Sequence, residues 1–166
     1  EQQNELETVL IKADGKLGKT LELAKKAGEQ FKTSMGKIDP KTAGYSVGYI
    51  YGDNTTAGAR DILDVLSGKV AGVTVNIETR EVKLRSTGSI NADVPPLWDV
   101  DGVVIDYIPQ VAPDDIKDIH LLKSLASTTR YGSNGRGGVI VVTTKSGDFS
   151  AAAASKRNKI AEQYTN

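Results

Sequence analysis

The sequence predicts an α+β fold in which a small mixed β-sheet packs against helices. Residues 138–145 (GVIVVTTK) form the most apolar strand-like run of the chain, which is typical of the centre of a sheet. Asp101-Gly102 separates two apolar runs, 97–100 and 103–105, and this dipeptide supports the positive φ angles of a tight hairpin. Short helical segments at 59–66 and 124–131 flank the expected strands.

These elements give the order β-α-β-β-β-β-β-α-β. In the helix over 59–66, Ile62, Leu63 and Leu66 share one face, and Ser67-Gly68 ends it. Strand 82–85 alternates apolar and charged residues, as expected of a strand with one buried face. The other expected elements are strands 46–51, 73–77 and 116–122, a helical turn at 113–115, and the hairpin and final strand already described.

Composition divides the chain into an N-terminal extension (1–56), a core domain (57–147) and a C-terminal helix or linker (148–166). In the extension, apolar or small residues recur at three- and four-residue steps from Leu17 to Phe31, which predicts an amphipathic helix over 17–33. In the tail, Ala151 to Ala154 are strong helix formers, so a second terminal helix is expected there.

The charge balance and the residue inventory exclude several classes of function. Lys and Arg number 21, as do Asp and Glu, so the chain lacks the basic excess that a nucleic-acid-binding protein needs. Without cysteine it has no disulfide and no thiolate metal site. No apolar run approaches the roughly 20 residues of a membrane helix, so we expect the isolated chain to be soluble.

Individual polar residues do not combine into a catalytic or cofactor site. His120 is the single histidine and alternates with Ile119 and Leu121, which favours a solvent-facing strand position. Asp99 and Asp101 are interpreted as solvated acids near the hairpin turn, and Trp98 as a core residue. The Gly-rich run 132–138 lies between a helix and a strand, the reverse of a phosphate-binding loop. We therefore predict no enzyme activity, no metal and no cofactor.

Four ordered blocks carry a family resemblance. Residues 64–75 (DVLSGKVAGVTV), 82–90 (VKLRSTGSI), 96–103 (PLWDVDGV) and 116–123 (IKDIHLLK) with 130–140 (RYGSNGRGGVI) and 145–147 resemble the plug domain of TonB-dependent receptors. The residue pattern of these blocks is most similar to that of the SusC-like branch of Bacteroidetes. The positions that carry the pattern are Gly72, Asp101, Gly102, Tyr131, Gly132 and Gly138.

The resemblance implies a plug-like fold with N- and C-terminal helical extensions and a non-enzymatic role. It implies that the domain gates the pore of an outer-membrane nutrient transporter, on the periplasmic side in a Gram-negative bacterium, and relays the energy-transducer signal. The implied partners are a cognate β-barrel encoded downstream and a substrate-binding surface lipoprotein. Arg85 and Arg136 match family arginines that contact acids of the barrel wall.

A second resemblance lies near the N-terminus. Residues 7–13 (ETVLIKA) are similar to a TonB box, which in the family pairs as an added strand with the C-terminal domain of TonB. An ordinary terminal strand, or the first turn of the following helix, is the alternative interpretation. The partner-binding residues implied by the resemblance are Glu7, Thr8, Val9, Leu10, Ile11, Lys12 and Ala13.

The sequence also departs from the family pattern. The connection 76–81 is short, Ser86 stands where the family has glycine, and only 19 residues follow Gly147. Because those residues favour a helix, an alternative function stays open. In that alternative the chain is a barrel-less, plug-like interaction module within a larger periplasmic or surface protein.

Overall fold

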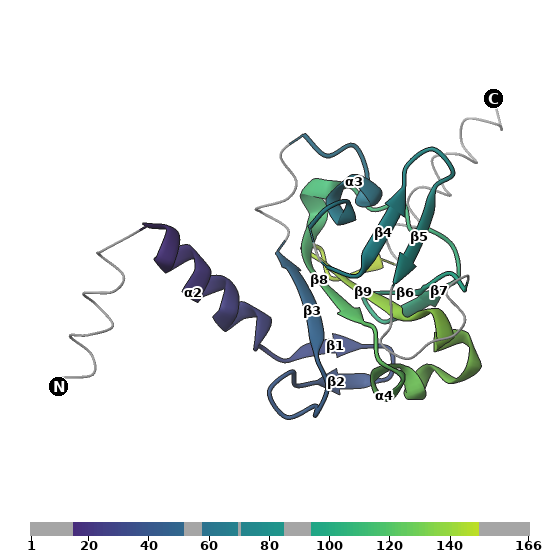
Figure 1. The fold of residues 1–166 in the computed structure, drawn as a ribbon, viewed down its shortest axis with the longest axis horizontal. Coiled ribbons are helices and arrows are strands. Elements are labelled where there is room, and N and C mark those ends of the chain that lie inside the picture. Colours follow the sequence, from purple (N-terminus) through teal and green to yellow (C-terminus); the bar gives the residue numbers. More distant parts are fainter. Residues whose placement is uncertain (1–14, 52–57, 70, 85–93, 150–166) are drawn as a thin grey trace.

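A five-stranded mixed sheet forms the centre of the protein (Figure 1). The computed structural model describes residues 15–51, 58–69, 71–84 and 94–149. In spatial order the strands are β3 (Val47–Tyr51), β8 (Ile116–Leu122), β9 (Val139–Thr144), β6 (Leu97–Val100) and β7 (Val103–Ile105). Strand β9 runs antiparallel to β8 and parallel to β6. The predicted α+β fold and the central position of the final strand are confirmed.

Strand β9 is buried on both faces of this sheet. Ile140 lies in register between Leu121 of β8 and Trp98 of β6, and these three face one side. The next residue, Val141, lies between His120 and Asp99 and faces the other side. Since successive side chains of a strand point to opposite faces, an unbroken apolar run requires a cover on each face.

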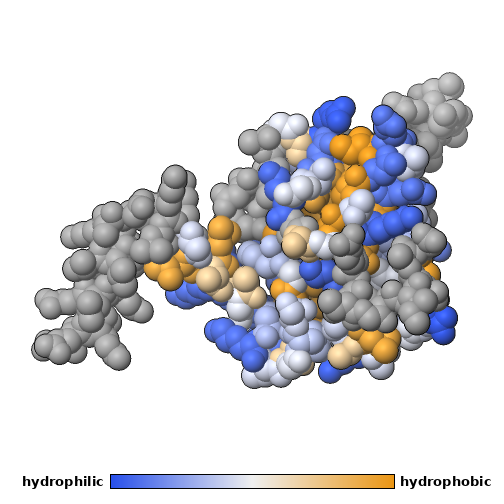
Figure 2. Space-filling model, in the orientation of Figure 1, coloured by the Kyte–Doolittle hydropathy of each residue, from blue (hydrophilic) through white to orange (hydrophobic). Residues whose placement is uncertain are grey.

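The first face is covered by one helix and a two-stranded hairpin from the middle of the chain. Helix α3 (Ile62–Leu66) and strands β4 (Val73–Asn76) and β5 (Glu81–Leu84) contribute buried side chains to one core with Trp98 and Ile140. The predicted core position of Trp98 is confirmed. In the view of Figure 2, hydrophobic surface shows over α3 and β4, where Val73 and Val75 are half-buried and Ile77 is exposed.

The second face is covered by a hairpin from the N-terminal part of the chain, β1 (Phe31–Thr33) and β2 (Gly36–Ile38). Phe31 and Ile38 pack with Leu122, Val141 and Tyr131 in a second, smaller core. We call residues 31–38 the N-terminal hairpin. Its chain reversal uses Gly36 at φ 109°, a conformation that favours glycine.

The predicted helix over 17–33 is wrong in its last third. Helix α2 spans Gly15–Ala27, ends at Gly28, and projects away from the sheet in Figure 1. Phe31 continues the three-to-four-residue apolar spacing of the helix in sequence. In the structure, however, Phe31 and Thr33 are buried while Lys32 between them is exposed, which is the two-residue period of a strand.

The remaining predicted elements within the described residues are present, some of them with shorter or slightly shifted bounds. Helix α3 begins at Ile62 because Asp61 caps it, and η2 (Pro113–Asp115) is the predicted helical turn. Helix α4 (Leu125–Thr128) continues as 3-10 turns, η3 (Thr129–Gly137), with a break at Gly132. The predicted tail helix lies outside the described residues. Within those residues, no helix has the length and apolar character needed to cross a membrane.

Gly138 offers a test of how tightly β9 enters the sheet. It has φ 91° and ψ 172°, and a Cβ there would lie 2.6 Å from Leu84 Cδ1 and 3.1 Å from the Leu122 carbonyl oxygen. We expect Gly138→Ala to lower the free energy of unfolding by about 2–4 kcal/mol through backbone strain and overpacking. Gly147→Ala, at φ 71° with open space around it, should cost only about 1 kcal/mol. Urea denaturation compares the two, and equal losses would contradict the packing argument.

Candidate functional site

The predicted partner-binding residues lie outside the described part of the chain. This holds for residues 7–13 and for Arg85, so their roles stay predictions. Arg136 is exposed on η3, and its expected partner also stays a prediction. Glycines 72, 102, 132 and 138 all have positive φ, which accounts for glycine at these junctions in plain conformational terms.

The hairpin predicted at Asp101-Gly102 is confirmed, and it is fastened to β9. Both residues have positive φ, 49° and 87°, and the flanking strands pair in antiparallel register. Asp101 Oδ1 accepts a hydrogen bond from the Thr144 backbone N–H at 2.9 Å, and Oδ2 accepts one from the Thr144 hydroxyl. The acid therefore links the β6–β7 turn to the end of the central strand.

Asp99 is the polar centre of the junction between the sheet and the N-terminal hairpin. Its Oδ2 accepts hydrogen bonds from the Ser34 N–H at 2.8 Å, the Ser34 hydroxyl at 2.7 Å and the Tyr131 hydroxyl at 2.7 Å. Asp99 is 0% exposed, so its interpretation as a solvated turn acid is wrong. The reason is that its strand face is covered by the N-terminal hairpin, whose first strand falls within the helix predicted over 17–33.

Burial sets the electrostatics of this contact. A carboxylate that is buried away from water needs several hydrogen-bond donors to offset the loss of hydration. The three hydrogen bonds to Oδ2 of Asp99 meet that need in part. Oδ1 of Asp99 has no hydrogen-bond partner among the described residues. Burial, together with the hydrogen bond to Asp99, raises the pKa of Tyr131 well above its ordinary value. Tyr131 therefore stays a neutral donor to Asp99.

His120 lies under the same hairpin and is also buried. Its ring stacks on Phe31 with centroids 3.7 Å apart, and Tyr49 lies 5.2 Å away. Neither ring nitrogen has a hydrogen-bond partner among the described residues, and the side chain is 3% exposed. The predicted solvent-facing position is therefore wrong, although His120 does point away from Ile119 and Leu121. Burial lowers the pKa of His120 to about 4, partly opposed by the charge of Asp118.

The hairpin thus joins the N-terminal part of the chain to the centre of the sheet. Helix α2 leads directly into β1, and the β1–β2 turn bonds to Asp99 of β6. Within the described residues, no three His, Cys, Asp or Glu side chains are placed to hold a metal ion. The arrangement suits a mechanical connection. The sequence signal that could have revealed it is the short alternation Phe31-Lys32-Thr33 followed by Gly36.

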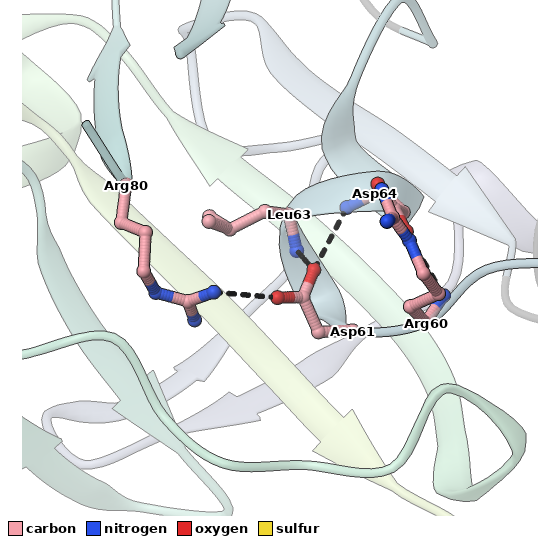
Figure 3. Close-up of polar contacts among 5 residues, drawn as sticks. All are labelled: Arg60, Asp61, Leu63, Asp64 and Arg80. Atoms are coloured by element: carbon pink, nitrogen blue, oxygen red, sulfur yellow. Dashed lines mark hydrogen bonds and ion pairs between the residues drawn. The ribbon is translucent and has the colours of Figure 1, made fainter. Parts of the chain in front are cut away.

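A second polar connection fastens the cover on the opposite face (Figure 3). Asp61 Oδ1 caps helix α3 by accepting hydrogen bonds from the N–H groups of Leu63 and Asp64 at 3.0 and 3.2 Å. Its Oδ2 pairs with Arg80 at 2.9 Å, which ties the β4–β5 turn to the helix. A further pair, Arg60 with Asp64 at 3.0 Å, is largely exposed on the arginine side. The Arg60 hydrogen bond lowers the pKa of Asp64.

Comparison with known proteins finds relatives of one kind. No family model matches the chain. TonB-dependent receptor P26 of Formosa agariphila is 36% identical over 109 residues, covering 60% of this chain and 11% of that receptor. TonB-dependent receptor SusC of Bacteroides thetaiotaomicron is 38% identical over 99 residues, covering 51% of this chain and 10% of SusC. The chain therefore spans about a tenth of the length of these relatives.

A solved structure agrees with the sequence comparison. The RagAB peptide importer in its "open-open" state matches with a TM-score of 0.52 and 28% identity, over 66% of this chain and 13% of that one. These findings confirm the resemblance to the plug domain of SusC-like TonB-dependent receptors. Receptors of this kind belong to the outer membrane of Gram-negative bacteria. The relatives are receptors and transporters.

The Asp99 contact yields a stability prediction. Asp99→Ala leaves the Ser34 and Tyr131 donors without their acceptor, and should lower the free energy of unfolding by about 2–4 kcal/mol. Tyr131→Phe removes one of the three bonds and should cost about 1–2 kcal/mol. In a double-mutant cycle measured by urea denaturation, the two losses should not add. The exposed acid Asp106 supplies a control, since Asp106→Ala should change stability by less than about 0.5 kcal/mol.

The two oxygens of Asp61 can be separated by substitution. Asp61→Asn keeps a capping oxygen and loses only the partly exposed ion pair with Arg80, so we expect a loss of at most about 1 kcal/mol. Asp61→Ala also removes the cap and should lose about 1 kcal/mol more. Thermal unfolding followed by circular dichroism measures both. Equal losses from the Asn and Ala variants would show that the cap contributes nothing.

Proposed function

We propose that this chain, which is similar in sequence and fold to the plug domain of SusC-like TonB-dependent receptors, gates the pore of an outer-membrane nutrient transporter without enzymatic activity. We assign it the further role of relaying the signal of the energy transducer. The proposal is supported by the order of the chain, in which the TonB-box-like residues 7–13 precede α2 and the N-terminal hairpin. The turn of this hairpin bonds to buried Asp99.

This order supports a relay because the N-terminal hairpin is attached to the sheet less firmly than strand β9. Residues 7–13 are a short β-prone run that can add to the edge of a partner's sheet through backbone hydrogen bonds. The hairpin strands β1 and β2 have three residues each, so much of the hold on the sheet comes from side-chain contacts. Strand β9 is paired on both sides and buried on both faces, so it should resist opening under force longer than the hairpin does. A pull on residues 7–13 therefore acts first on the hairpin.

The partners follow from the same proposal. The C-terminal domain of TonB would bind residues 7–13, and a β-barrel transporter wall would surround the plug and contact Arg85 and Arg136. A surface lipoprotein that binds the nutrient would complete the assembly. The transported class would be a large nutrient such as a peptide or a glycan. RagAB is a peptide importer, which supports the peptide.

Binding of TonB is the experiment that tests the proposal. A TonB C-terminal domain titrated into the 166-residue chain should shift the backbone NMR signals of residues 7–13. Val9→Pro should abolish these shifts, because proline removes a backbone donor and cannot pair inside an added strand. Gln3→Pro, four positions upstream of Glu7 and thus outside the predicted box, should bind as the unaltered chain does.

Two outcomes would contradict the relay. Equal affinity of Val9→Pro and the unaltered chain would show that residues 7–13 do not pair as a strand. If no signal shifts even at high TonB concentration, the plug-like fold stands and the relay is lost. The function would then be that of a barrel-less interaction module within a larger periplasmic or surface protein.

A further inference from the structure

We propose that the N-terminal hairpin is a proton-released cover of the sheet, which opens when the imidazole of His120 takes up a proton. The inference concerns residues 31–38 and the sheet face beneath them. It does not require that residues 7–13 bind TonB, and it goes beyond the function proposed above.

The position of His120 leaves the hairpin as its barrier to water. The backbone of His120 is paired on one side with Tyr49 of β3 and on the other with Val141 of β9, so the residue cannot turn to the other face. On its own face, Phe31 of the hairpin stacks on the ring at a centroid distance of 3.7 Å and an interplanar angle of 8°. Movement of the hairpin away from the sheet would therefore expose the imidazole to water.

In the closed state, the surroundings of the ring compensate a positive charge only in part, through the charge of Asp118. From β3, Tyr49 faces the ring and donates its hydroxyl hydrogen to Asp118, which lies two residues from His120 on β8. Asp99 of β6 lies in the same row with one strand between, at a distance of about 10 Å from strand spacing alone. On the hairpin, Lys32 and Lys37 are exposed. Neither ring nitrogen has a hydrogen-bond partner among the described residues.

Opening would satisfy two buried groups at once. Water would reach both nitrogens of His120 and the Oδ1 atom of Asp99, which also has no partner among the described residues. The loss is limited to the Phe31 stack, the Ser34 bonds and the apolar contacts of a hairpin whose strands have three residues each. The other face of the sheet, with its larger core around α3, is not disturbed.

The direction of the pH dependence follows from linkage. Burial lowers the pKa of His120 to about 4 in the closed state, whereas the hydrated ring of the open state has its ordinary value of 6.5. Neutral His120 therefore makes its full contribution to the free energy of the closed state above pH 6.5. This contribution is lost as the pH falls from 6.5 towards 4. One proton taken up on opening makes the open fraction rise about tenfold per pH unit in that window, or about 30-fold between pH 7.5 and pH 5.

Amide hydrogen exchange of the 166-residue chain measures the opening directly. Exchange rates of residues 31–38 are divided by those of unstructured peptides at each pH, which removes the intrinsic pH dependence. We expect protection of the hairpin amides to fall about 30-fold from pH 7.5 to pH 5, while that of Ile140 and Val142 in β9 stays constant.

Three variants separate the effect of protonating His120 from the effect of the contacts that hold the hairpin. His120→Phe keeps a ring against Phe31 but cannot titrate, so hairpin protection should be independent of pH between 7.5 and 5. His120→Gln carries the same expectation if the phenylalanine variant does not fold. Ser34→Ala removes the 2.7 Å hydroxyl bond to Asp99. It should lower hairpin protection at every pH and keep the slope.

Three results would overturn the proposal. The first is hairpin protection in the unaltered chain that changes by less than about threefold between the two pH values, since one proton requires about 30-fold. The second is an undiminished slope in a folded His120 variant, which would assign the proton to another group. The third is a parallel loss of protection in β9, which would show acid unfolding of the whole domain.

Discussion

The structure depends on the burial of strand β9 on both faces. Its run of apolar residues, Val139 to Val142, makes the strand a good centre for the sheet and also exposes apolar surface on two sides. One cover comes from the segment immediately after β3, where α3 and the β4–β5 hairpin pack on Trp98 and Ile140. The other must come from elsewhere in the chain, and the N-terminal hairpin supplies it. This segment therefore belongs physically to the core.

The two covers differ in kind. Around α3 the interface is almost wholly apolar, and its polar contacts, such as Asp61 with Arg80, lie at the surface. Beneath the N-terminal hairpin, polar side chains lie inside the interface, with Asp99 and His120 flanking Val141 across three strands. Burial of apolar area is favourable in any orientation, whereas buried polar groups depend on a few specific contacts. The N-terminal hairpin is therefore the cover whose attachment depends most on specific polar contacts.

Much of the fold could be predicted from the sequence, from β3 to β9, because local signals mark its elements. Asp101-Gly102 specifies its turn, Asp61 and Gly132 bound helices, and the final strand is apolar throughout. The N-terminal hairpin was missed because helical spacing continues as far as Phe31 and the strands are only three residues long. The errors at His120 and Asp99 follow from that one omission. His120 does point away from Ile119 and Leu121, as its alternation predicts, but the sequence predicts no cover for that face.

An acid at position 99 can select one position of the N-terminal hairpin, which an apolar residue could not do. A leucine or valine there would also be buried, but it would accept any apolar surface of the hairpin. The Asp99 carboxylate instead selects Ser34, because the backbone N–H and the hydroxyl of that one residue converge on Oδ2. Tyr131 donates to the same atom and holds the acid from the other side. Buried polar contacts can specify register in this way even where they contribute little net stability. At this junction, the selected register also fixes the position of β1, the strand that follows helix α2 in the chain.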